Sequence, residues 1–429
     1  MRRLAFLGVF MLLVGMAPAA FASDTAAIDG ATAAGLCDAS YPGVSGPDQL
    51  SECQWDMAAI HAGAASQAKA TGEGVTVGII DGGVDFTHPD LAGAIDVGLS
   101  CSFIYSTTPT ADPAEIANGN CANKAAVQDL QGHGTHVATT VAGRINGIGI
   151  VGVAPDATIV ALKACTIAGF CFVDSVAAAL RYAGDQHLDV VNLSLFADPF
   201  LYYCKNDAEQ RAMLKVMLEA SRYAQQQGVV IVAAAGNEAQ DLGHRTIDDI
   251  SPDWPLDTAV EREVGNNCRV SPAELPGVIT VSARGVNTIA SYSTVGNPID
   301  VTAPGGDAGQ TAATVYGRGR ILAGWSGSDD TGEWDFYAAN NRAIVSGGGR
   351  YVWISGTSMA SPHVAGVAAL VRENHPGWSP AAVAAAIRRS ATPLACDVAA
   401  NPDLTCYGRS GNTSFYGAGM VDALGAASR

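Results

Sequence analysis

Residues 356–366 read Gly-Thr-Ser-Met-Ala-Ser-Pro-His-Val-Ala-Gly, and the interpretation of the whole chain starts from them. Beyond Ser358, apolar residues recur at the three- and four-residue steps of a buried helix: Val364, Val367, Ala368 and Val371. Ser358 is therefore predicted at or just inside a helix N-terminus. Free backbone N–H groups and the positive end of the helix dipole can stabilise a developing negative charge there. Serine is also a common helix cap, so this stretch alone does not establish a nucleophile.

Upstream of this stretch, apolar runs alternate with helical patterns. A nearly continuous apolar run over residues 75–80 is typical of a buried parallel strand, and Asp81 follows it directly. Further strands are expected near 157–163, 189–195 and 229–234, and helices near 173–187 and 208–227. This alternation predicts an α/β fold, a three-layer α/β/α sandwich with a mainly parallel central sheet. Sites in such sheets form at the carboxyl ends of strands, where Asp81 is expected.

The first 22 residues predict a secretory signal peptide. Arg2 and Arg3 precede an apolar core, and residues 20–22 read Ala-Phe-Ala, which fits a cleavage site before Ser23. The apolar run is too short for a transmembrane anchor, so no membrane attachment is expected once the signal is removed. We therefore expect a secreted protein, extracellular or periplasmic. The formal net charge of −17 argues against nucleic acid as the main partner.

Ten cysteines follow the predicted signal peptide, and an even number in an exported chain indicates disulfides. The sequence alone does not give their connectivity. We favour pairing in chain order, because four of the five bridges then close short local loops: 37–53, 101–121, 165–171, 204–268 and 396–406. Free buried thiols would fit a cytosolic chain better.

The mature chain divides into a short lead-in and one large domain. Residues 23–54 are rich in small side chains and form the predicted lead-in, and residues 55–429 form the domain. At 429 residues and 48% hydrophobic content, the chain can bury a large core. Surface insertions are expected near 99–128, 239–271 and 305–350, where polar, glycine-rich or aromatic segments interrupt the alternation of strands and helices.

Three residue types suited to acyl transfer stand at predicted strand ends or helix starts, in the order Asp81, His133 and Ser358. A serine hydroxyl is a weak nucleophile unless a base removes its proton. An imidazole does this best when a buried carboxylate fixes its tautomer and stabilises the imidazolium. Each residue alone has an ordinary structural explanation, but the three together favour nucleophilic catalysis.

The stretches around these residues resemble the three signature motifs of the subtilisin family of serine proteases. They are residues 79–85 (IIDGGVD), 132–138 (GHGTHVA) and 356–363 (GTSMASPH), and the order of Asp, His and Ser also matches. The resemblance implies a subtilisin-like fold from Trp55 onward and a serine endopeptidase.

Carried over residue by residue, the resemblance also assigns roles. Asp81 orients and charge-balances His133, which acts as general base and then as general acid, and Ser358 attacks the scissile carbonyl. Asn237 matches the family's side-chain donor to the oxyanion, and the Ser358 N–H is the second donor. The structural alternative for Asn237 is a turn residue after a strand.

The same resemblance implies how a peptide is held. Gly169 and Phe170 match an edge segment that pairs with substrate residues upstream of the cut by β-augmentation. Ser194 and Leu195 match one wall of the pocket for the residue before the cut, and Gly236 lies on the facing wall.

One position departs from the family pattern. The family usually follows Ser-Leu with two glycines, whereas this chain has Phe196 followed by alanine. The phenyl ring either enters the pocket or turns outward and leaves it open, and the sequence does not decide between these two orientations. The usual preference for large apolar residues before the cut therefore stays open.

No cofactor is expected for catalysis, but the resemblance implies a structural calcium site. Asp90 and Asn146 match positions that bind calcium in many relatives, and hard oxygen ligands suit Ca²⁺. The alternative is purely structural: Asp90 caps a helix and Asn146 turns a loop.

The sequence thus predicts a secreted, monomeric serine endopeptidase that acts on protein or peptide substrates. One alternative is a narrow processing protease, whose access Phe196 and the insertions restrict. A second is an inactive scaffold of the same fold, which the intact Asp, His, Ser and Asn disfavour. A third is an esterase of the α/β-hydrolase type, which would need a Gly-x-Ser-x-Gly elbow that residues 356–360 lack.

Overall fold

The structure is a computed structural model that describes residues 28–29, 37, 40–311, 317, 319–397 and 401–429. The predicted signal peptide, residues 1–22, lies outside the described residues. Among the helices of the described ranges, none is both long enough and apolar enough to cross a bilayer.

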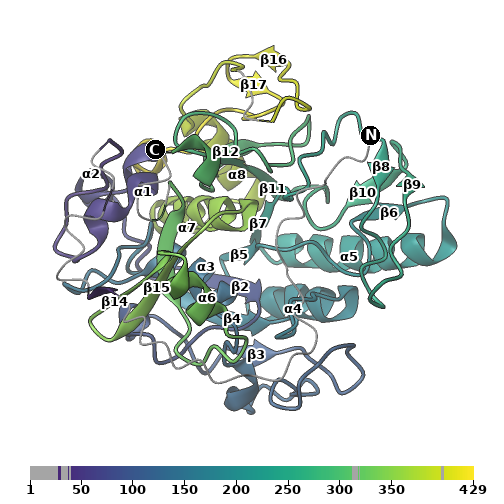
Figure 1. Cartoon of the computed structure of the whole chain (residues 1–429), viewed down its shortest axis with the longest axis horizontal. Helices are drawn as coiled ribbons and strands as arrows, with labels where there is room; N and C mark the ends of the chain where they lie inside the picture. Colours follow the sequence, from purple (N-terminus) through teal and green to yellow (C-terminus); the bar gives the residue numbers. More distant parts are fainter. Residues whose placement is uncertain (1–27, 30–36, 38–39, 312–316, 318, 398–400) are drawn as a thin grey trace.

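A seven-stranded sheet forms the centre of the described part of the chain (Figure 1). All six neighbouring pairs in this sheet run parallel. Its strands, in spatial order, are β12 (Val301–Pro304), β11 (Ile279–Arg284), β7 (Val230–Ala234), β5 (Val190–Leu193), β2 (Thr76–Asp81), β4 (Thr158–Lys163) and β3 (Cys101–Ser102). The predicted parallel sheet is therefore confirmed.

Alternate residues of each central strand face two separate cores, because successive side chains of a strand point to opposite faces. Ile79 of β2 packs in one core and Ile80 in the other. In Figure 1, α3 and α7 cover one face of the sheet, and α4 and α5 cover the other. These helices are α3 (His133–Ala142), α4 (Val173–Asp185), α5 (Ala208–Gln226) and α7 (Thr357–Asn374). The predicted three-layer α/β/α sandwich is thus also confirmed.

Residues 305–350, expected as a surface insertion, contribute to a second sheet. It contains β1 (Ile28–Asp29), β14 (Ala343–Ser346), β15 (Gly349–Ile354) and β13 (Ile321–Trp325), in that order. Helix α6 (Glu333–Ala339) lies between β13 and β14 in the chain. Trp325 is 1% exposed and belongs to the main core, so this segment is packed into the domain rather than laid on its surface.

The described part of the lead-in packs on this second sheet. Leu50 and Cys53 are buried in one cluster with Trp353 and other residues of the sheet. Gln54 donates to Val151 O over 2.8 Å and accepts from Val151 N–H over 2.9 Å. The end of the lead-in is therefore fastened to the domain.

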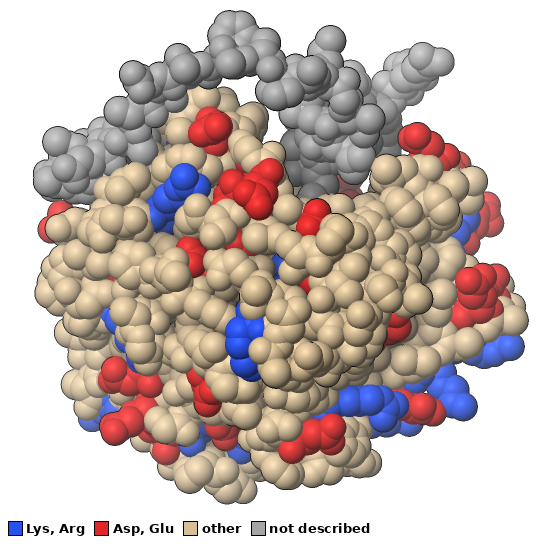
Figure 2. All heavy atoms as spheres, turned by 90° about the horizontal axis from the view of Figure 1, so that it is seen from below, with Lys and Arg blue, Asp and Glu red and all other residues tan. Residues whose placement is uncertain are grey.

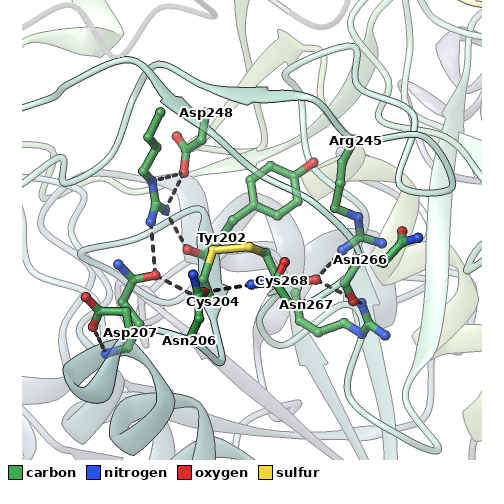
Figure 3. Close-up of a disulfide and its surroundings, with 12 residues drawn as sticks. Tyr202, Cys204, Asn206, Asp207, Arg245, Asp248, Asn266, Asn267 and Cys268 are labelled. Atoms are coloured by element: carbon green, nitrogen blue, oxygen red, sulfur yellow. Dashed lines mark hydrogen bonds and ion pairs between the residues drawn. A yellow bond between two sulfur atoms is a disulfide. The ribbon is translucent and has the colours of Figure 1, made fainter.

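The 239–271 segment forms a lobe with the chain that follows β5. Strand β6 (Tyr202–Cys204) pairs antiparallel with β10 (Cys268–Val270), and a disulfide joins the directly opposed Cys204 and Cys268 (Figure 3). A shorter pair, β8 (Ile247–Asp248) and β9 (Arg262–Glu263), lies within the same segment.

Within the described residues, five disulfides join cysteines in chain order: Cys37–Cys53, Cys101–Cys121, Cys165–Cys171, Cys204–Cys268 and Cys396–Cys406. This is the pairing favoured from the sequence, and it is confirmed.

The remaining elements close the domain. Ser379 caps α8 by accepting the N–H of Ala382. These elements are α1 (Trp55–Ala59), α2 (Ala64–Gln67), α8 (Pro380–Ser390), β16 (Gly408–Arg409), β17 (Asn412–Thr413) and α9 (Ala423–Ala427). On the face drawn in Figure 2, acidic and basic side chains lie in small groups on a mainly uncharged surface.

Candidate active site

Asp81 is the last residue of β2, at the carboxyl edge of the central sheet. Its side chain is 4% exposed, and Oδ1 accepts the N–H of Gly82 over 2.7 Å. In the register of β2 and β5, Ile80 lies opposite Leu193, so Asp81 and Ser194 come next on adjacent strands. The parallel sheet therefore brings these two residues together although they lie far apart in the sequence.

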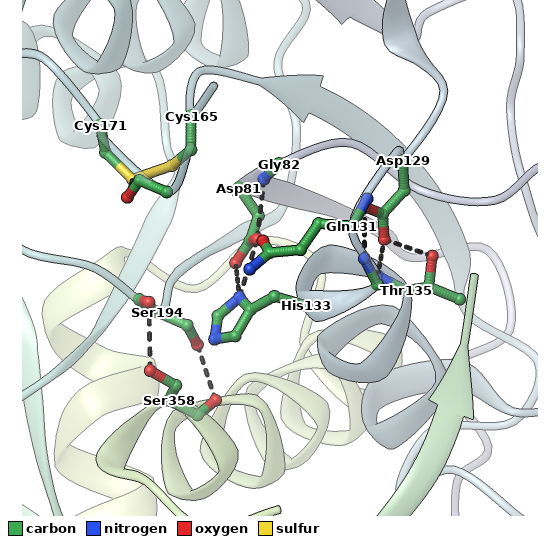
Figure 4. A network of polar contacts seen from close by, with 12 residues as sticks. Asp81, Gly82, Asp129, Gln131, His133, Thr135, Cys165, Cys171, Ser194 and Ser358 are labelled. Atoms are coloured by element: carbon green, nitrogen blue, oxygen red, sulfur yellow. Dashed lines mark hydrogen bonds and ion pairs between the residues drawn. A yellow bond between two sulfur atoms is a disulfide. The ribbon is translucent and has the colours of Figure 1, made fainter. Parts of the chain in front are cut away.

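His133 is the first residue of α3 and faces Asp81. Its Nδ1 lies 2.9 Å from Asp81 Oδ1 and 3.0 Å from Oδ2, so Nδ1 carries the donated hydrogen and Nε2 is left for chemistry (Figure 4). Burial disfavours the charged imidazole, but the charge and hydrogen bonds of Asp81 outweigh it and raise the pKa of His133. The ring keeps 21% of its surface exposed, so a substrate can reach it.

Asp129, which the sequence analysis missed, fixes the start of α3. Its carboxylate accepts the N–H groups of Gln131, Gly132 and Thr135, at 2.8 to 3.0 Å. Burial raises the pKa of Asp129 to about 6, against the lowering effect of these bonds and of Lys163. An acidic residue just before a helix start is the ordinary signal of such a cap and could have found it.

A buried ion pair fastens the 99–128 segment beneath the Asp81 turn. Lys163 Nζ lies 3.0 Å from Glu115, and both side chains are at most 1% exposed. The same Nζ donates to Gly82 O over 2.7 Å. Because its partners lie far away in the sequence, no local pattern predicts this pair. Together with β3, it shows that the 99–128 segment supports the site rather than lying on the surface only.

Ser358 is the second residue of α7, as predicted from its sequence context. Its Oγ donates to Ser194 O over 3.2 Å, and its carbonyl oxygen accepts from Ser194 Oγ over 2.8 Å. That carbonyl is free because Pro362, four residues on, has no N–H to donate to it. Asn192 completes this Ser194–Ser358 junction. Its side-chain NH₂ donates to Ser194 Oγ over 2.9 Å, and its side-chain oxygen accepts the hydroxyl of Ser361 over 2.6 Å.

Figure 4 draws His133 between Asp81 and the Ser194–Ser358 pair. Among the described residues, the hydroxyl of Ser358 has its hydrogen bond with Ser194 O, and none joins it to His133. The three residues predicted as a triad are thus gathered at one edge of the sheet, with the serine hydroxyl turned toward the wall of the site.

Asn237 follows β7 and contacts the turn before the serine. Its Oδ1 accepts both the N–H and the hydroxyl of Thr357, at 2.8 and 2.9 Å. Since the Thr357 N–H can only donate, the side-chain atom facing it must be the oxygen, and the amide NH₂ points away from Thr357. Gly236 has a φ of +117°, a backbone conformation that strains any residue with a side chain, so glycine is favoured there.

Gly169 and Phe170 lie in a tight turn closed by the Cys165–Cys171 disulfide. Gly169 adopts a φ of +89°, and the Phe170 carbonyl oxygen accepts the N–H of Thr166 over 2.9 Å. The Phe170 ring stacks on Phe172, with centroids 5.8 Å apart, and meets Trp254 edge-on at 5.5 Å. The disulfide and the ring contacts of Phe170 therefore hold this turn in place.

The structure decides between the two orientations of Phe196. Its partly buried ring packs against the cluster around the Cys204–Cys268 disulfide, with Leu201 and Val270 among its members. Leu195, the residue before it, packs instead on the core shared with α4 and α5. The ring of Phe196 thus turns outward toward the lobe.

Asp90 and Asn146, the predicted calcium ligands, do lie together. Asn146 Nδ2 donates to Asp90 Oδ1 over 3.2 Å, and Ile150 N–H donates to Asp90 Oδ2 over 2.9 Å. Burial raises the pKa of Asp90 to about 7, against these bonds. In the part of the chain that the structure describes, no group of three or more His, Cys, Asp or Glu side chains is arranged to hold a metal ion. The two residues therefore form a hydrogen-bonded joint, and calcium there stays a prediction.

The family model described as the subtilase family matches residues 72–419. The chain belongs to the subtilase family. It is accordingly a serine endopeptidase of subtilisin type, and subtilases need no cofactor for catalysis.

Relatives extend over most of the chain. M-protease of Shouchella clausii is 30% identical over 370 residues, which cover 86% of this chain and 68% of that protein. Subtilisin Savinase of Lederbergia lenta is 29% identical over 370 residues, covering 86% of this chain and 96% of that protein. Among solved structures, fervidolysin of Fervidobacterium pennivorans, a keratinolytic enzyme related to subtilisin, has a TM-score of 0.60 at 27% identity and covers 89% of this chain and 46% of its own.

Proposed function

We propose that this subtilase is an exported endopeptidase that cleaves peptide bonds through an acyl-enzyme on Ser358. The observation that carries the proposal is the pair of short bonds from His133 Nδ1 to Asp81, which leave Nε2 free beside the Ser194–Ser358 junction. In the proposed active arrangement, the Ser358 side chain rotates and exchanges its bond to Ser194 O for one to His133 Nε2.

In the proposed reaction, His133 Nε2 takes the proton of Ser358 Oγ as that oxygen bonds to the scissile carbonyl carbon. The imidazolium then gives this proton to the leaving amine as the C–N bond breaks. Water attacks the acyl-enzyme next: His133 takes one of its protons and returns it to Ser358 Oγ as the ester bond breaks. Asp81 stays ionised throughout and stabilises the imidazolium.

The carbonyl oxygen becomes negative after attack and needs donors aimed at its new position. The Ser358 N–H is one of the first amides of α7, which have no partners inside the helix. The Asn237 NH₂ is the second donor that we propose, and the bonds of its oxygen to Thr357 support this orientation. Because Asn237 is held before the substrate arrives, little reorganisation is needed in the transition state.

For the substrate, we propose that Ser194, Leu195 and Gly236 form the walls of the pocket for the residue before the cut. The edge backbone at Gly169 and Phe170 would pair with substrate residues upstream of the cut. Since the Phe196 ring packs against the lobe, the pocket is left open to a large side chain.

Secretion also belongs to the proposal, with residues 1–22 as the signal peptide and residues 55–429 as a monomeric domain. The five disulfides support an oxidising compartment. Calcium at Asp90 and Asn146 is testable by thermal unfolding: bound calcium would raise the unfolding temperature, and excess chelator would remove the increase.

The test is labelling of the purified, disulfide-bonded protein with a fluorophosphonate, followed by peptide mass mapping. We expect one adduct on Ser358, which is lost when His133 is replaced by Ala. Ser358→Ala should lower kcat for peptide hydrolysis on the order of 10⁶-fold with an unchanged unfolding temperature. Ser390→Ala, on the remote helix α8, is the control and should label like the unchanged protein. An adduct elsewhere, or hydrolysis that persists in Ser358→Ala, would exclude the mechanism.

A further inference from the structure

Two backbone segments run together beside the catalytic edge. The edge arm is residues 169–172, and the wall arm is residues 194–198; Figure 4 labels Cys171 on the first and Ser194 on the second. The arms meet at a parallel bridge between Phe172 and Asp198. Asp198 N–H donates to Cys171 O over 3.0 Å, and the Asp198 carboxylate accepts the Cys171 N–H. One residue of the wall arm therefore holds the edge arm with both its backbone and its side chain.

Asp198 is 4% exposed, and its carboxyl hydrogen-bonds to the carboxyl of Asp253, in the 239–271 segment. Asp253 N–H also donates to Pro199 O over 3.0 Å, so Asp253 approaches the end of the wall arm with its backbone too. Burial raises the pKa of Asp198 well above its usual range, and the nearby Asp253 raises it further. Burial raises the pKa of Asp253 as well, whereas the bond to Asp198 lowers it. Burial therefore favours a protonated, neutral carboxyl group within this pair.

Other titratable groups lie nearby: Tyr203 interacts with both carboxyl groups, Asp248 acts on Asp253, and Arg262 acts on Tyr203. Arg262 is ion-paired with Asp248, so its charge is already balanced. The Tyr203 hydroxyl donates to Ala197 O, which anchors the wall arm from its other side. Because Arg262 is already paired with Asp248, it does not neutralise the two carboxylates. Two buried carboxyl groups can then lie together only if they share a proton.

We propose that Asp198 is a positioning residue for peptide binding: it fastens the edge arm to the wall arm and so sets the width of the slot that receives an extended substrate backbone. This inference rests on the proposed function, because it assigns the slot to that enzyme's substrate. Asp198 touches neither Ser358 nor His133 in this arrangement, so it acts through the two arms and not on the reacting atoms.

The role predicts different effects on two kinds of substrate. An extended peptide, with four or more residues before the cut, needs both arms at the right separation. A small activated ester, which occupies only the serine, the histidine and the oxyanion donors, does not. Loss of Asp198 should therefore weaken peptide binding and spare ester hydrolysis. A merely structural loss of folded enzyme would lower both rates together.

The experiment compares Asp198→Ala and Asp198→Asn in the full, disulfide-bonded enzyme, after fluorophosphonate titration of Ser358 to count active sites. We expect Asp198→Ala to raise KM for an extended peptide about tenfold and to change kcat/KM for the ester less than about twofold. Asn can accept the Cys171 N–H and donate to Asp253, so Asp198→Asn should restore the peptide KM to within about twofold. The control is Asp300→Ala: Asp300 also accepts a backbone N–H, from Thr280 at 3.0 Å, but lies beside β12.

Should Asp198→Ala fail to fold, Asp253→Ala decides the question, because it loosens the same junction from outside both arms and should raise the peptide KM about threefold. An unchanged peptide KM in the folded variants would overturn the proposal, as would equal losses on peptide and ester, or a failure of Asn to rescue. Absence of any Ser358 adduct in the unchanged enzyme would instead be a failure of the proposed function, and the titration step detects it separately.

Discussion

The catalytic edge of the central sheet and the lobe around the Cys204–Cys268 disulfide both bury polar groups, but different forces hold them. At the edge, Asp81 ends β2 and Ser194 follows β5, two buried parallel strands whose neighbours fix them in register. In the lobe, the two paired strands are only three residues long, and a disulfide joins them (Figure 3). The Arg245–Glu274 ion pair, at 2.8 Å with both side chains 4% exposed, adds a second cross-link. The comparison teaches that the chemistry is positioned by the sheet, whereas the surrounding lobe depends on cross-links.

The largest expected effect is at the edge. Asp81→Asn should lower kcat about 10⁴-fold with little change in stability, because the asparagine favours the wrong histidine tautomer. Asp81 raises the pKa of His133, and activity needs the neutral imidazole, so activity is lost as pH falls through that raised pKa. Without the carboxylate, the acid limb of the kcat/KM profile should move to lower pH. The control is Asp85→Asn, because Asp85 is a carboxylate in the same turn and is 2% exposed. If the acid limb of the kcat/KM profile does not move in Asp81→Asn, Asp81 is not the partner that raises the pKa of His133.

The next effect belongs to the lobe. Replacing Cys204 and Cys268 by Ser removes a bridge across a separation of 64 residues and should lower the free energy of unfolding by about 4 kcal/mol. At 25 °C, kcat on a small ester should stay within about twofold. The matched control is the Cys396–Cys406 bridge, which closes only 10 residues and should cost about 3 kcal/mol. Denaturant unfolding and ester kinetics measure both; a large loss of kcat in the folded Cys204/Cys268 variant would break the comparison.

Asn237→Ala should lower kcat about 10²-fold and leave KM nearly unchanged, since the proposed donor acts on charge that exists only in the transition state. The variant also frees the N–H of Thr357, so some loss of stability is expected. Steady-state kinetics with a peptide and an ester should show the same loss in kcat. A rise in KM at constant kcat would assign Asn237 to substrate binding instead.

The smallest effect is expected at Phe196, on the border of the two regions. Because its partly buried ring packs on the lobe, Phe196→Ala should lower the free energy of unfolding by about 2 kcal/mol. Peptide-library profiling should show a selectivity change of less than about threefold for the residue before the cut. A change above tenfold would mean that the ring lines the pocket.

Much of the fold was predictable from the sequence because its signals are local. The apolar runs that became β2, β5 and β7 need no partner to be recognised, and α7 shows its helical spacing directly. Four of the five chain-order disulfides also close short local loops. The second sheet was not predictable, because β13 and β15 pair across a long intervening segment and β1 joins from the far N-terminal side. Glycine and aromatic residues in 305–350 gave no periodic pattern.

By itself, the sequence determined the family, the order of Asp81, His133 and Ser358, and the strand ends and helix start that carry them. Only the tertiary structure decided that Ser194 hydrogen-bonds to both the hydroxyl and the carbonyl oxygen of Ser358. It alone also decided that Phe196 turns toward the lobe and that Asp198 joins the edge arm to the wall arm. The physical reason is the distance along the chain over which each interaction acts. Periodicity, caps and motifs act within a few residues, whereas side-chain orientation and buried hydrogen bonds depend on partners that only the folded chain brings together.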